Sequence, residues 1–524
     1  MWNRDPASPS FGSFDRQWWG WKFKDFGDAT LQYAARLTIA YAEEIGATAT
    51  LPALVEGFVG HVQQLQLRDG SFDQCYPNER TPGVIYDILS TLVAIRRSGW
   101  VGGESARQLD DAMSRAVGFC LRTDEKHGEV ANHIAEFAYE LLNYAAFSGD
   151  ERARRRALGY LDRLLSLFER EEGWFHEYHG PDAGYQTRAL RYVTRCAELL
   201  DDTALWDVAE RAARFVGELL MPDGSVHPML GVRSTALVYP SAFERLAARD
   251  SQFRPLADRI RYGWEKRRVP MPSAIDFQNA VRLADDARDA AELAGDTQAP
   301  VVPPPITPTD GWRVFEKAGV MTRKTDRQAL YVGVRLGGPV VMYGRETSGD
   351  WTLRYEDAGY LLRDDKVWVS RAPNAGELVS RTDEAVVLRT RFHRSLHDEV
   401  TPGRMLLLRL LNLTVLRSQL LGDLFRKIVV RHLMGEHPPS AVALERTVRV
   451  EGEHVQVRDR IIGRNGAKLF RCRRLTGMHM ASSRYFQDAE LAALPVGWCD
   501  PVEGDESIVD CGAAPDAVMA GQAR

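Results

Sequence analysis

The sequence predicts a multidomain α+β protein in which a helical N-terminal domain precedes a C-terminal domain of antiparallel strands. The chain has 524 residues, too many for a single core. Apolar residues recur at three- and four-residue steps as far as about residue 295, as in amphipathic helices. A proline-rich stretch follows, and after it come short β-branched and alternating runs. We expect domains at 1–295 and 312–524 and a linker at 296–311.

The helices are predicted from apolar stripes, each long enough for two or more turns. The stripes lie near residues 30–45, 50–66, 83–97, 104–121, 132–147, 151–168, 184–200, 203–220, 235–248 and 274–294. The segment GDTQAPVVPPPITPTDG ends the series, because proline lacks the amide hydrogen that a helix or strand needs.

A weak internal repeat suggests how the helices are arranged. RDGSFDQCYP, EEGWFHEYHG and PDGSVHPMLG share an acidic–glycine core, at Gly70, Gly173 and Gly224. The second spacing is about half the first, so a fourth copy is expected near residue 122. A loop of one kind after alternate helices predicts a ring of helical hairpins with these loops at one end. The alternative is that DG is simply a common turn dipeptide.

The C-terminal domain is predicted from short runs separated by turn residues, which is typical of antiparallel sheets. RMLLLRLLNLTVLRSQLLGDLF fits a helix as well as a strand by its pattern. The runs are ALYVGVRLGG, VVMYG, KVWVSR, EAVVLRTRF, RMLLLRLLNLTVLRS, KIVVRHLM, RTVRVEGEHVQVRDRIIG and KLFRCRRL.

The composition excludes several classes of protein. A formal net charge of −5 leaves no overall basic surface for nucleic acid. Six widely spaced cysteines predict neither a disulfide framework nor a zinc cluster. The N-terminus lacks the apolar core of a secretion signal, and no run approaches the roughly 18 apolar residues of a membrane helix. We therefore expect a cytoplasmic protein without a membrane partner, and the sequence leaves its oligomeric state unknown.

The candidate site residues are polar, aromatic and weakly basic, and they lie in or beside the repeated loops. Phenols and imidazoles can take a proton from carbon and give one to a leaving oxygen. Amides and guanidinium groups can neutralise a carboxylate or stabilise an enolate-like charge. Together they suit β-elimination at a uronic acid, with no metal or cofactor. The candidates are Asn132, His133, Tyr178, Tyr185, Glu79, His179, Arg188, His227, Arg233 and Tyr239.

Several of these residues have structural explanations as well. Asn132 is a preferred N-cap residue at the start of a helix. His133 lies near the edge of the apolar stripe, as a core histidine would. Tyr185 opens the next helix and could pack as an ordinary aromatic residue. His227 precedes a proline, as loop residues often do, and the HxxH spacing from His176 lacks a third metal ligand.

Particular phrases of the sequence resemble the heparinase II/III-like and alginate-lyase-like polysaccharide lyases. The resemblance spans nearly the whole chain and implies an (α/α) toroid of helical hairpins followed by an antiparallel β-sandwich. It also implies an acidic oligosaccharide or polysaccharide as substrate. The phrases are FDRQWWGWKFKDF, DGSFDQCYPNE, EVANHIAEFAYEL, EEGWFHEYHGPDAGYQTRALRYV and DAGYLLRDDKVWVSR.

The resemblance also implies roles for the candidates. Asn132 and His133 match the pair that binds the uronate carboxylate. Tyr185 is the best match for the catalytic tyrosine, and Tyr178 is the second choice. The remaining candidates would bind substrate.

The sequence departs from the family pattern at two places. Gln186 stands where many relatives have histidine, and the first sandwich strands, VVMYGRETSGDWTLRYEDAGYLL, contain no histidine. Glu346, Tyr343 or Arg345 could take its place.

Two other functions fit the sequence. A glycoside hydrolase on the same helices would need two carboxylates beside the bond, and Glu79, Glu136, Glu177 and Asp182 are available. A non-catalytic glycan-binding or assembly protein of polysaccharide biosynthesis would explain the missing histidine.

Overall fold

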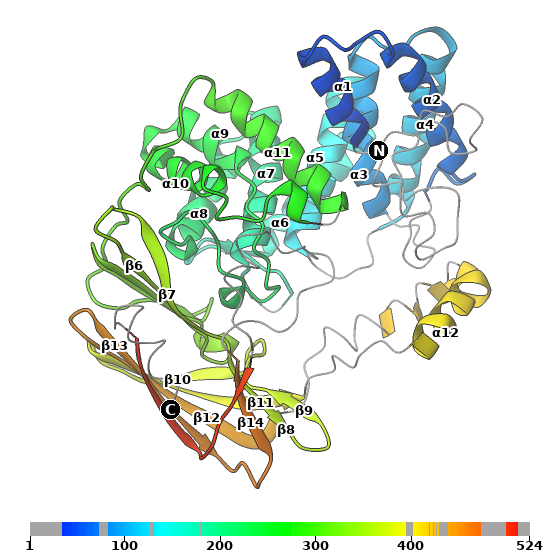
Figure 1. Cartoon of the computed structure of the whole chain (residues 1–524). Coiled ribbons are helices and arrows are strands. Elements are labelled where there is room, and N and C mark those ends of the chain that lie inside the picture. Colours follow the sequence, from blue (N-terminus) through cyan, green and yellow to red (C-terminus); the bar gives the residue numbers. More distant parts are fainter. Residues whose placement is uncertain are drawn as a thin grey trace.

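The chain forms a helical part and a part of antiparallel sheets, as this computed structural model shows (Figure 1). Helices extend to Ala294 and the sheets begin at Arg313. Two short strands, β1 (Phe168–Glu169) and β2 (Trp174–Phe175), pair within the helical part. The structure describes residues 34–72, 82–124, 130–178, 180–275, 277–394, 402–418, most of 420–428, 439–472 and 499–511.

The odd-numbered helices contact one another in succession, and α1 also contacts α11, so the series closes on itself. Each of α2, α4, α6, α8 and α10 packs against an odd-numbered neighbour. A helix that the sequence did not predict, α10, lies among them. The helices are α1 (Ala34–Glu44), α2 (Leu51–Leu65), α3 (Pro82–Arg97), α4 (Gly103–Arg122), α5 (Ala131–Ser148), α6 (Glu151–Ser166), α7 (Ala183–Leu200), α8 (Thr203–Leu219), α9 (Ser241–Arg249), α10 (Arg254–Glu265) and α11 (Phe277–Ala294).

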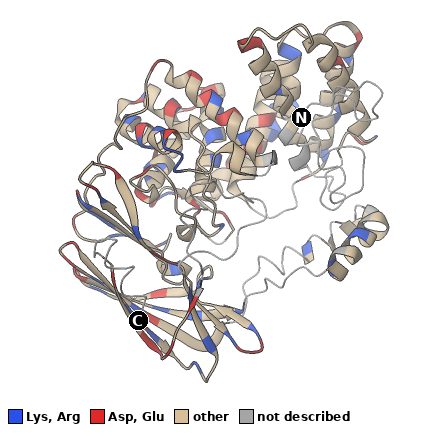
Figure 2. Ribbon diagram, in the orientation of Figure 1, with Lys and Arg blue, Asp and Glu red and all other residues tan. Residues whose placement is uncertain are grey.

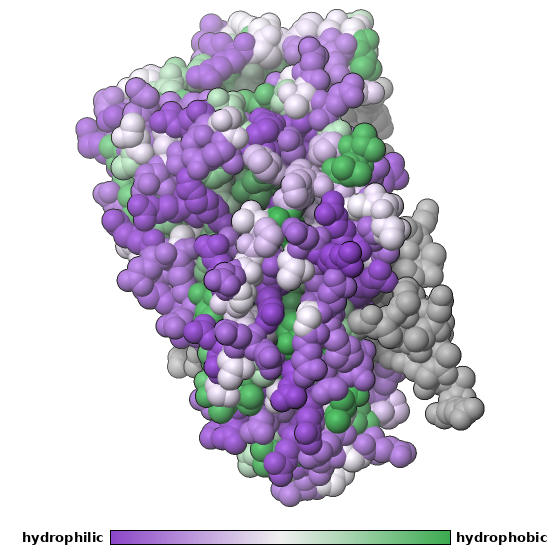
Figure 3. Space-filling model, turned by 90° about the vertical axis from the view of Figure 1, so that its left-hand side faces the viewer, coloured by the Kyte–Doolittle hydropathy of each residue, from purple (hydrophilic) through white to green (hydrophobic). Residues whose placement is uncertain are grey.

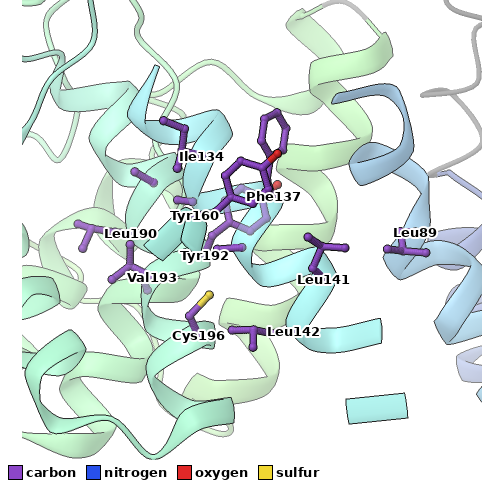
Figure 4. Close-up of a cluster of buried hydrophobic side chains, with 14 of the residues drawn as sticks. Leu89, Ile134, Phe137, Leu141, Leu142, Tyr160, Leu190, Tyr192, Val193 and Cys196 are labelled. Carbon is purple, nitrogen blue, oxygen red and sulfur yellow. The ribbon is translucent and has the colours of Figure 1, made fainter. Parts of the chain in front are cut away.

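Helices α5 and α7 lie side by side and are buried along most of their length. Every residue of α7 from Ala183 to Ala197 is buried. Figure 4 shows Phe137 and Leu141 of α5 gathered with Val193 and Cys196 of α7. Their packing gives the residues at the two N-terminal ends a rigid support.

The three repeated loops share one turn. Gly70, Gly173 and Gly224 have φ values of +90°, +82° and +83°, a region that favours glycine. A Cβ atom on each would lie 2.1, 2.6 and 2.2 Å from the carbonyl oxygens of Arg115, Arg211 and Arg259, respectively. Each loop therefore packs its glycine directly against the backbone of a later helix. The fourth copy expected near residue 122 falls partly on 125–129, outside the described residues.

The strands form two antiparallel sheets. The five-stranded sheet has the order β3-β4-β5-β6-β7, and the larger sheet has the order β15-β14-β8-β9-β11-β12-β13-β16 with β10 beside β11. Their bounds are β3 (Arg313–Phe315), β4 (Val320–Lys324), β5 (Gln328–Val332), β6 (Val340–Arg345), β7 (Trp351–Asp357), β8 (Gly359–Arg363), β9 (Val367–Val369), β10 (Gly376–Arg381), β11 (Ala385–Arg394), β12 (Pro439–Glu451), β13 (His454–Ile462), β14 (Lys468–Cys472), β15 (Cys499–Pro501) and β16 (Glu506–Cys511).

The ambiguous leucine-rich run is helical. Helix α12 (Pro402–Leu413) lies between β11 and β12, and its sequence is rich in leucine and contains no β-branched residue. The strand expected at 427–434 lies mostly outside the described residues. Among the described residues, no helix combines the length and apolar character that crossing a membrane requires.

An apolar cluster joins the helices to the five-stranded sheet. Met221 and Met229 pack with Tyr331 and Tyr343. The Tyr331 hydroxyl donates to the Leu220 carbonyl over 3.1 Å. The loop after α8 is therefore held by both parts of the chain.

Candidate active site

The candidate site begins where α5 starts, beside the second repeated loop. The Asn132 side chain is fully buried, and its amide nitrogen lies 2.8 Å from each carboxylate oxygen of Glu177. The Asn132 backbone N–H donates to the same carboxylate over 2.9 Å. Val130, not Asn132, is the N-cap residue, so the capping prediction was wrong. Asn132 instead holds a buried carboxylate from the neighbouring loop.

Arg233 lies between two tyrosine rings. Its guanidinium carbon is 4.6 Å from the Tyr178 ring centroid and 4.8 Å from that of Tyr185. One of its nitrogens lies 3.9 Å from the Glu177 carboxylate. Tyr178 has a φ of +62°, which is uncommon for tyrosine and turns the chain sharply after Glu177. Four residues from three separate segments thus form one cluster.

Asp182 fixes the position of both Tyr185 and Arg233. It caps α7 by accepting from the Tyr185 N–H over 3.1 Å, and its other oxygen accepts from the Arg233 N–H over 2.9 Å. A Cβ atom on Gly231 would lie 2.3 Å from this carboxylate. The loop that carries Arg233 therefore sits directly on the first turn of α7.

A buried ion pair lies deeper along the same two helices. Arg188 donates to Glu136 over 2.7 Å, and the Tyr192 hydroxyl lies 3.1 Å from the other Glu136 oxygen. Burial favours the neutral acid, but Arg188, Arg282 and His133 hold the pKa of Glu136 below its usual value. Arg188 therefore already has a carboxylate partner within the protein.

His133 and Tyr239 flank this pair. His133 is half-buried, with its ring centroid 6.2 Å from that of Phe137. Tyr239 is buried, which raises the pKa of its hydroxyl, and its backbone N–H donates to Thr187 over 3.0 Å.

Two residues of the C-terminal part of the chain contact the segment 227–234, which carries Arg233. Arg371 donates to the Gly231 carbonyl over 2.9 Å and to the Ser234 hydroxyl over 3.1 Å. A Glu356 oxygen lies 3.3 Å from Nε2 of His227. Glu346 instead pairs with Arg354 in its own hairpin over 2.6 Å. Sheet residues thus hold this loop, although the strands lack the expected histidine.

The structure brings Asn132, Tyr178, Tyr185 and Arg233 together, with Arg188 and Tyr239 packed behind them. His227 lies on the side that faces the sheets. Glu79 and His179 lie outside the described residues.

Sequence reasoning missed the roles of Glu177, Asp182 and Arg371. Glu177 and Asp182 were considered as hydrolase carboxylates, and neither was given a positioning role. Asp182 stands three residues before Tyr185, at the spacing of a helix cap, and this signal could have identified it. Arg371 follows β9, and no local pattern links it to a loop more than a hundred residues earlier.

The hydrolase alternative requires two carboxylates with free oxygens beside a sugar bond. Glu136 is bonded to Arg188 and Tyr192. Glu177 is bonded to Asn132, and Asp182 to backbone N–H groups. These buried carboxylates organise the protein, which disfavours this alternative.

Gln186 has a structural role. Its side chain accepts from the Phe175 N–H and donates to the carbonyls of Gly173 and Ala212, over 3.0, 3.0 and 3.1 Å, respectively. Gln66 makes the same kind of bonds to Gly70 and Ala112, over 3.1 and 2.8 Å. Gln66 thus braces its loop against α4, and Gln186 braces its loop against α8.

The titration of Glu177 should affect stability. Burial raises the pKa of its carboxyl to about 7, against the opposing effects of Arg233 and the Asn132 hydrogen bonds. The folded protein then binds this proton more tightly than the unfolded chain. Its contribution to the unfolding free energy is full below about pH 4.5 and falls by about 3 kcal/mol as the pH rises to about 7.

We expect Glu177→Gln to remove this pH dependence, because an amide keeps a carbonyl acceptor for Asn132 but does not titrate. Urea unfolding at several pH values, for both proteins, gives the difference. Other groups, including Glu140 with its pKa of about 8, cancel in that comparison. If the unfolding free energies of the two proteins changed with pH in the same way, the raised pKa of Glu177 would be contradicted.

A cavity of about 520 Å³ is lined by residues of the odd-numbered helices. On α5 and α7 these residues lie nearer to the C-terminal end of the helix than the cluster around Arg233 does. Arg195 and Arg245 line it, and both bond to Asp289 over 2.8 and 2.9 Å. Arg36 also lines it and bonds to Asp285. The cavity is thus bordered by arginines that have carboxylate partners. Among the described residues, no group of three or more His, Cys, Asp and Glu side chains is arranged to hold a metal ion.

No protein-family model and no curated protein matches the chain. Several solved polysaccharide lyases resemble it in structure. The chondroitin AC lyase of Streptomyces coelicolor A3 has a TM-score of 0.50 at 11% identity, covering 85% of this chain and 63% of that chain. A Paenibacillus xanthan lyase has a TM-score of 0.49 at 10% identity, covering 85% and 43%. Heparinase III has a TM-score of 0.48 at 11% identity, covering 84% and 63%.

The chain thus spans 63% or less of the length of each of these three structures. At 11% identity, the likeness to the chondroitin lyase shows a shared fold.

Proposed function

We propose that this protein is a lyase that cleaves a uronic-acid-containing oligosaccharide or polysaccharide by β-elimination. The observation that carries the proposal is the cluster in which Arg233 lies between the rings of Tyr178 and Tyr185. A guanidinium group beside two phenols supplies both charge neutralisation and proton transfer. The shared fold with a chondroitin AC lyase is consistent with an acidic glycan as substrate.

In this mechanism Arg233 binds the uronate carboxylate and so acidifies the C5 hydrogen. A phenolate of the cluster, or His133, takes that proton. The C4–O bond then breaks, a C4–C5 double bond forms, and a phenol protonates the departing oxygen. Tyr185 is the first choice for proton transfer, because Asp182 and Arg233 fix its position, and Tyr178 is the second.

The proposal gives Asn132 a different task from the one that the resemblance implies. Its amide nitrogen is already bonded to Glu177, so Arg233 is assigned to the substrate carboxylate. Burial raises the pKa of Glu177 to about 7, so this carboxyl is partly protonated at neutral pH. Asn132 and Glu177 are therefore positioning residues.

The proposal includes an (α/α) toroid for the helices and a β-sandwich for the two sheets. The closed succession of α1 to α11 and the antiparallel pairing of all described strands support this architecture. A cytoplasmic location remains part of the proposal.

The test is ultraviolet absorbance of the 4,5-unsaturated product, with mass spectrometry, across a panel of uronate oligosaccharides. The expected result is a product with a new double bond from at least one acidic oligosaccharide and from no neutral one. Sugar release without a double bond would indicate hydrolysis instead. Binding without any change in the ligand would indicate a glycan-binding protein.

A further inference from the structure

The cavity of about 520 Å³ has a place of its own in the fold. Residues of all the odd-numbered helices, α1 to α11, line it. Its volume falls in the range of sites that bind small molecules, about 300–1,000 Å³. On α7 it begins at Arg195, about 15 Å further along the helix than Tyr185. The buried ion pairs of Arg188 and Arg191 come between, so the cavity is separate from the cluster around Arg233.

The charged side chains of the cavity are mostly basic, although the formal net charge of the chain is −5. Basic and acidic residues are mixed along the helical part (Figure 2), and hydrophilic residues predominate on the outer face that Figure 3 shows. What distinguishes the cavity is a local excess of arginine. The arginines are Arg36, Arg97, Arg195, Arg245 and Arg288, and the acidic residues are Glu43, Glu198 and Asp289.

Two of these arginines share one carboxylate. Arg195 and Arg245 donate to the same oxygen of Asp289, over 2.8 and 2.9 Å. Their side chains are exposed by only 8% and 10%. Glu198 lies 3.5 Å from Arg245, but its side chain is 59% exposed, so water screens that pair. One buried carboxylate therefore balances two buried guanidinium groups.

Arg245 also has a donor that is not used. Its Nη1 atom is buried and has no hydrogen-bond partner in the part of the chain that the structure describes. Proteins rarely leave a buried N–H group without an acceptor, because the loss of its bonds to water costs free energy. Arg97 stacks on the Phe147 ring at 5.4 Å and has no acidic side chain within 4 Å among the described residues. An oxyanion in the cavity would supply both missing partners.

The other polar groups of the cavity suit a molecule with hydroxyl groups. The Asn143 amide donates to the Ser90 hydroxyl over 3.1 Å, which leaves its carbonyl oxygen to accept from a ligand. Tyr139 lines the same cavity and packs under Arg195, with 5.3 Å between the guanidinium carbon and the ring centroid. Amide and phenol groups commonly bind hydroxyl groups.

We propose that this cavity is a second binding site, for a molecule of about the size of a sugar that carries a carboxylate or phosphate group. The oxyanion accepts from Arg245, and Arg97 adds a second positive charge. Asn143 accepts from a hydroxyl group of the same molecule. The proposal does not depend on the proposed reaction, because the cavity includes neither Arg233 nor the two tyrosines.

The test is isothermal titration of the full chain with inorganic phosphate, glucuronate and glucose. We expect saturable binding of at least one of the two anions and none of glucose, and the tighter anion identifies the source of the oxyanion. Arg245→Lys should weaken this binding by about tenfold, because lysine keeps a charge beside Asp289 but lacks Nη1. Arg249→Lys is the matched control, since Arg249 is an exposed arginine of the same helix outside the cavity.

Arg97→Gln provides a second variant in case Arg245→Lys does not fold, because Arg97 is exposed. It should weaken binding several-fold. Failure of both anions to bind would overturn the proposal, as would glucose binding equal to that of glucuronate. Equal affinities of Arg245→Lys and Arg249→Lys would also overturn it, and if Arg245→Lys does not fold, an unchanged affinity of Arg97→Gln would do so.

A further variant separates the two sites. Arg233→Gln should bind the anion as the wild-type protein does, because Arg233 does not line the cavity. Loss of binding in this variant would place the anion at the cluster of Arg233 and the two tyrosines, and the second site would be disproved.

Discussion

Tyr185→Phe is expected to lower the rate of unsaturated-product formation by about 100-fold or more, the usual contribution of a positioned acid or base. The ring would still stack on Arg233, so substrate binding should survive while proton transfer is lost. The measurement is steady-state kinetics on an oligosaccharide that the wild-type protein cleaves. We expect kcat to fall and KM to change little.

Two further variants serve as controls for that result. Tyr41→Phe alters an exposed phenol of α1 and should leave the rate unchanged. Tyr178→Phe shows whether the second phenol shares the chemistry. If both cluster variants cleave substrate at the wild-type rate, neither phenol transfers the proton and the mechanism is wrong.

Arg446→Met is expected to lower the free energy of unfolding by about 3–5 kcal/mol, because it leaves the buried Asp459 carboxylate without the guanidinium group that bonds both of its oxygens. Arg446 is fully buried and donates to both oxygens of Asp459 over 2.7 Å. It also lies 3.2 Å from Asp357, which Arg471 contacts as well. Two arginines and two aspartates thus form a balanced group that joins β7 to the larger sheet.

Arg449→Met provides the matched control for this substitution. Arg449 lies on the same strand, is exposed, and pairs with Glu451 over 3.6 Å, so its loss should cost less than about 1 kcal/mol. Urea unfolding of both variants gives the comparison. Equal, small losses would show that the buried group contributes little to stability.

The sequence predicted the local elements better than the contacts between them. Three- and four-residue spacing gave most of the helices up to Ala294, because one apolar face is a local property. It missed α10, although the sequence of this helix, RPLADRIRYGWE, is strongly amphipathic. The predicted runs do not include the strands β3, β4, β7, β8, β10, β15 and β16, most of which are short or carry few apolar residues.

The candidate site shows the same division. The residue types of the cluster were recognisable, because the repeated loops marked the places where polar side chains gather. The hydrogen-bond partners of these residues could not be predicted, since Asn132 bonds to Glu177, which lies 45 positions away in the chain. Hydrogen bonds of this kind depend on how α5 and α7 pack, and no single segment encodes that packing.

The hold of Arg371 on the loop at 228–234 has a consequence for dissecting the molecule. If the chain were cut at the linker, the helical fragment would lose this anchor and present Met221, Met229 and Leu230 to solvent. The fragment would then be prone to aggregate, and the loop that carries Arg233 would keep the anchor from Asp182 but lose the one from Arg371. Biochemistry on this protein therefore requires both parts in a single polypeptide.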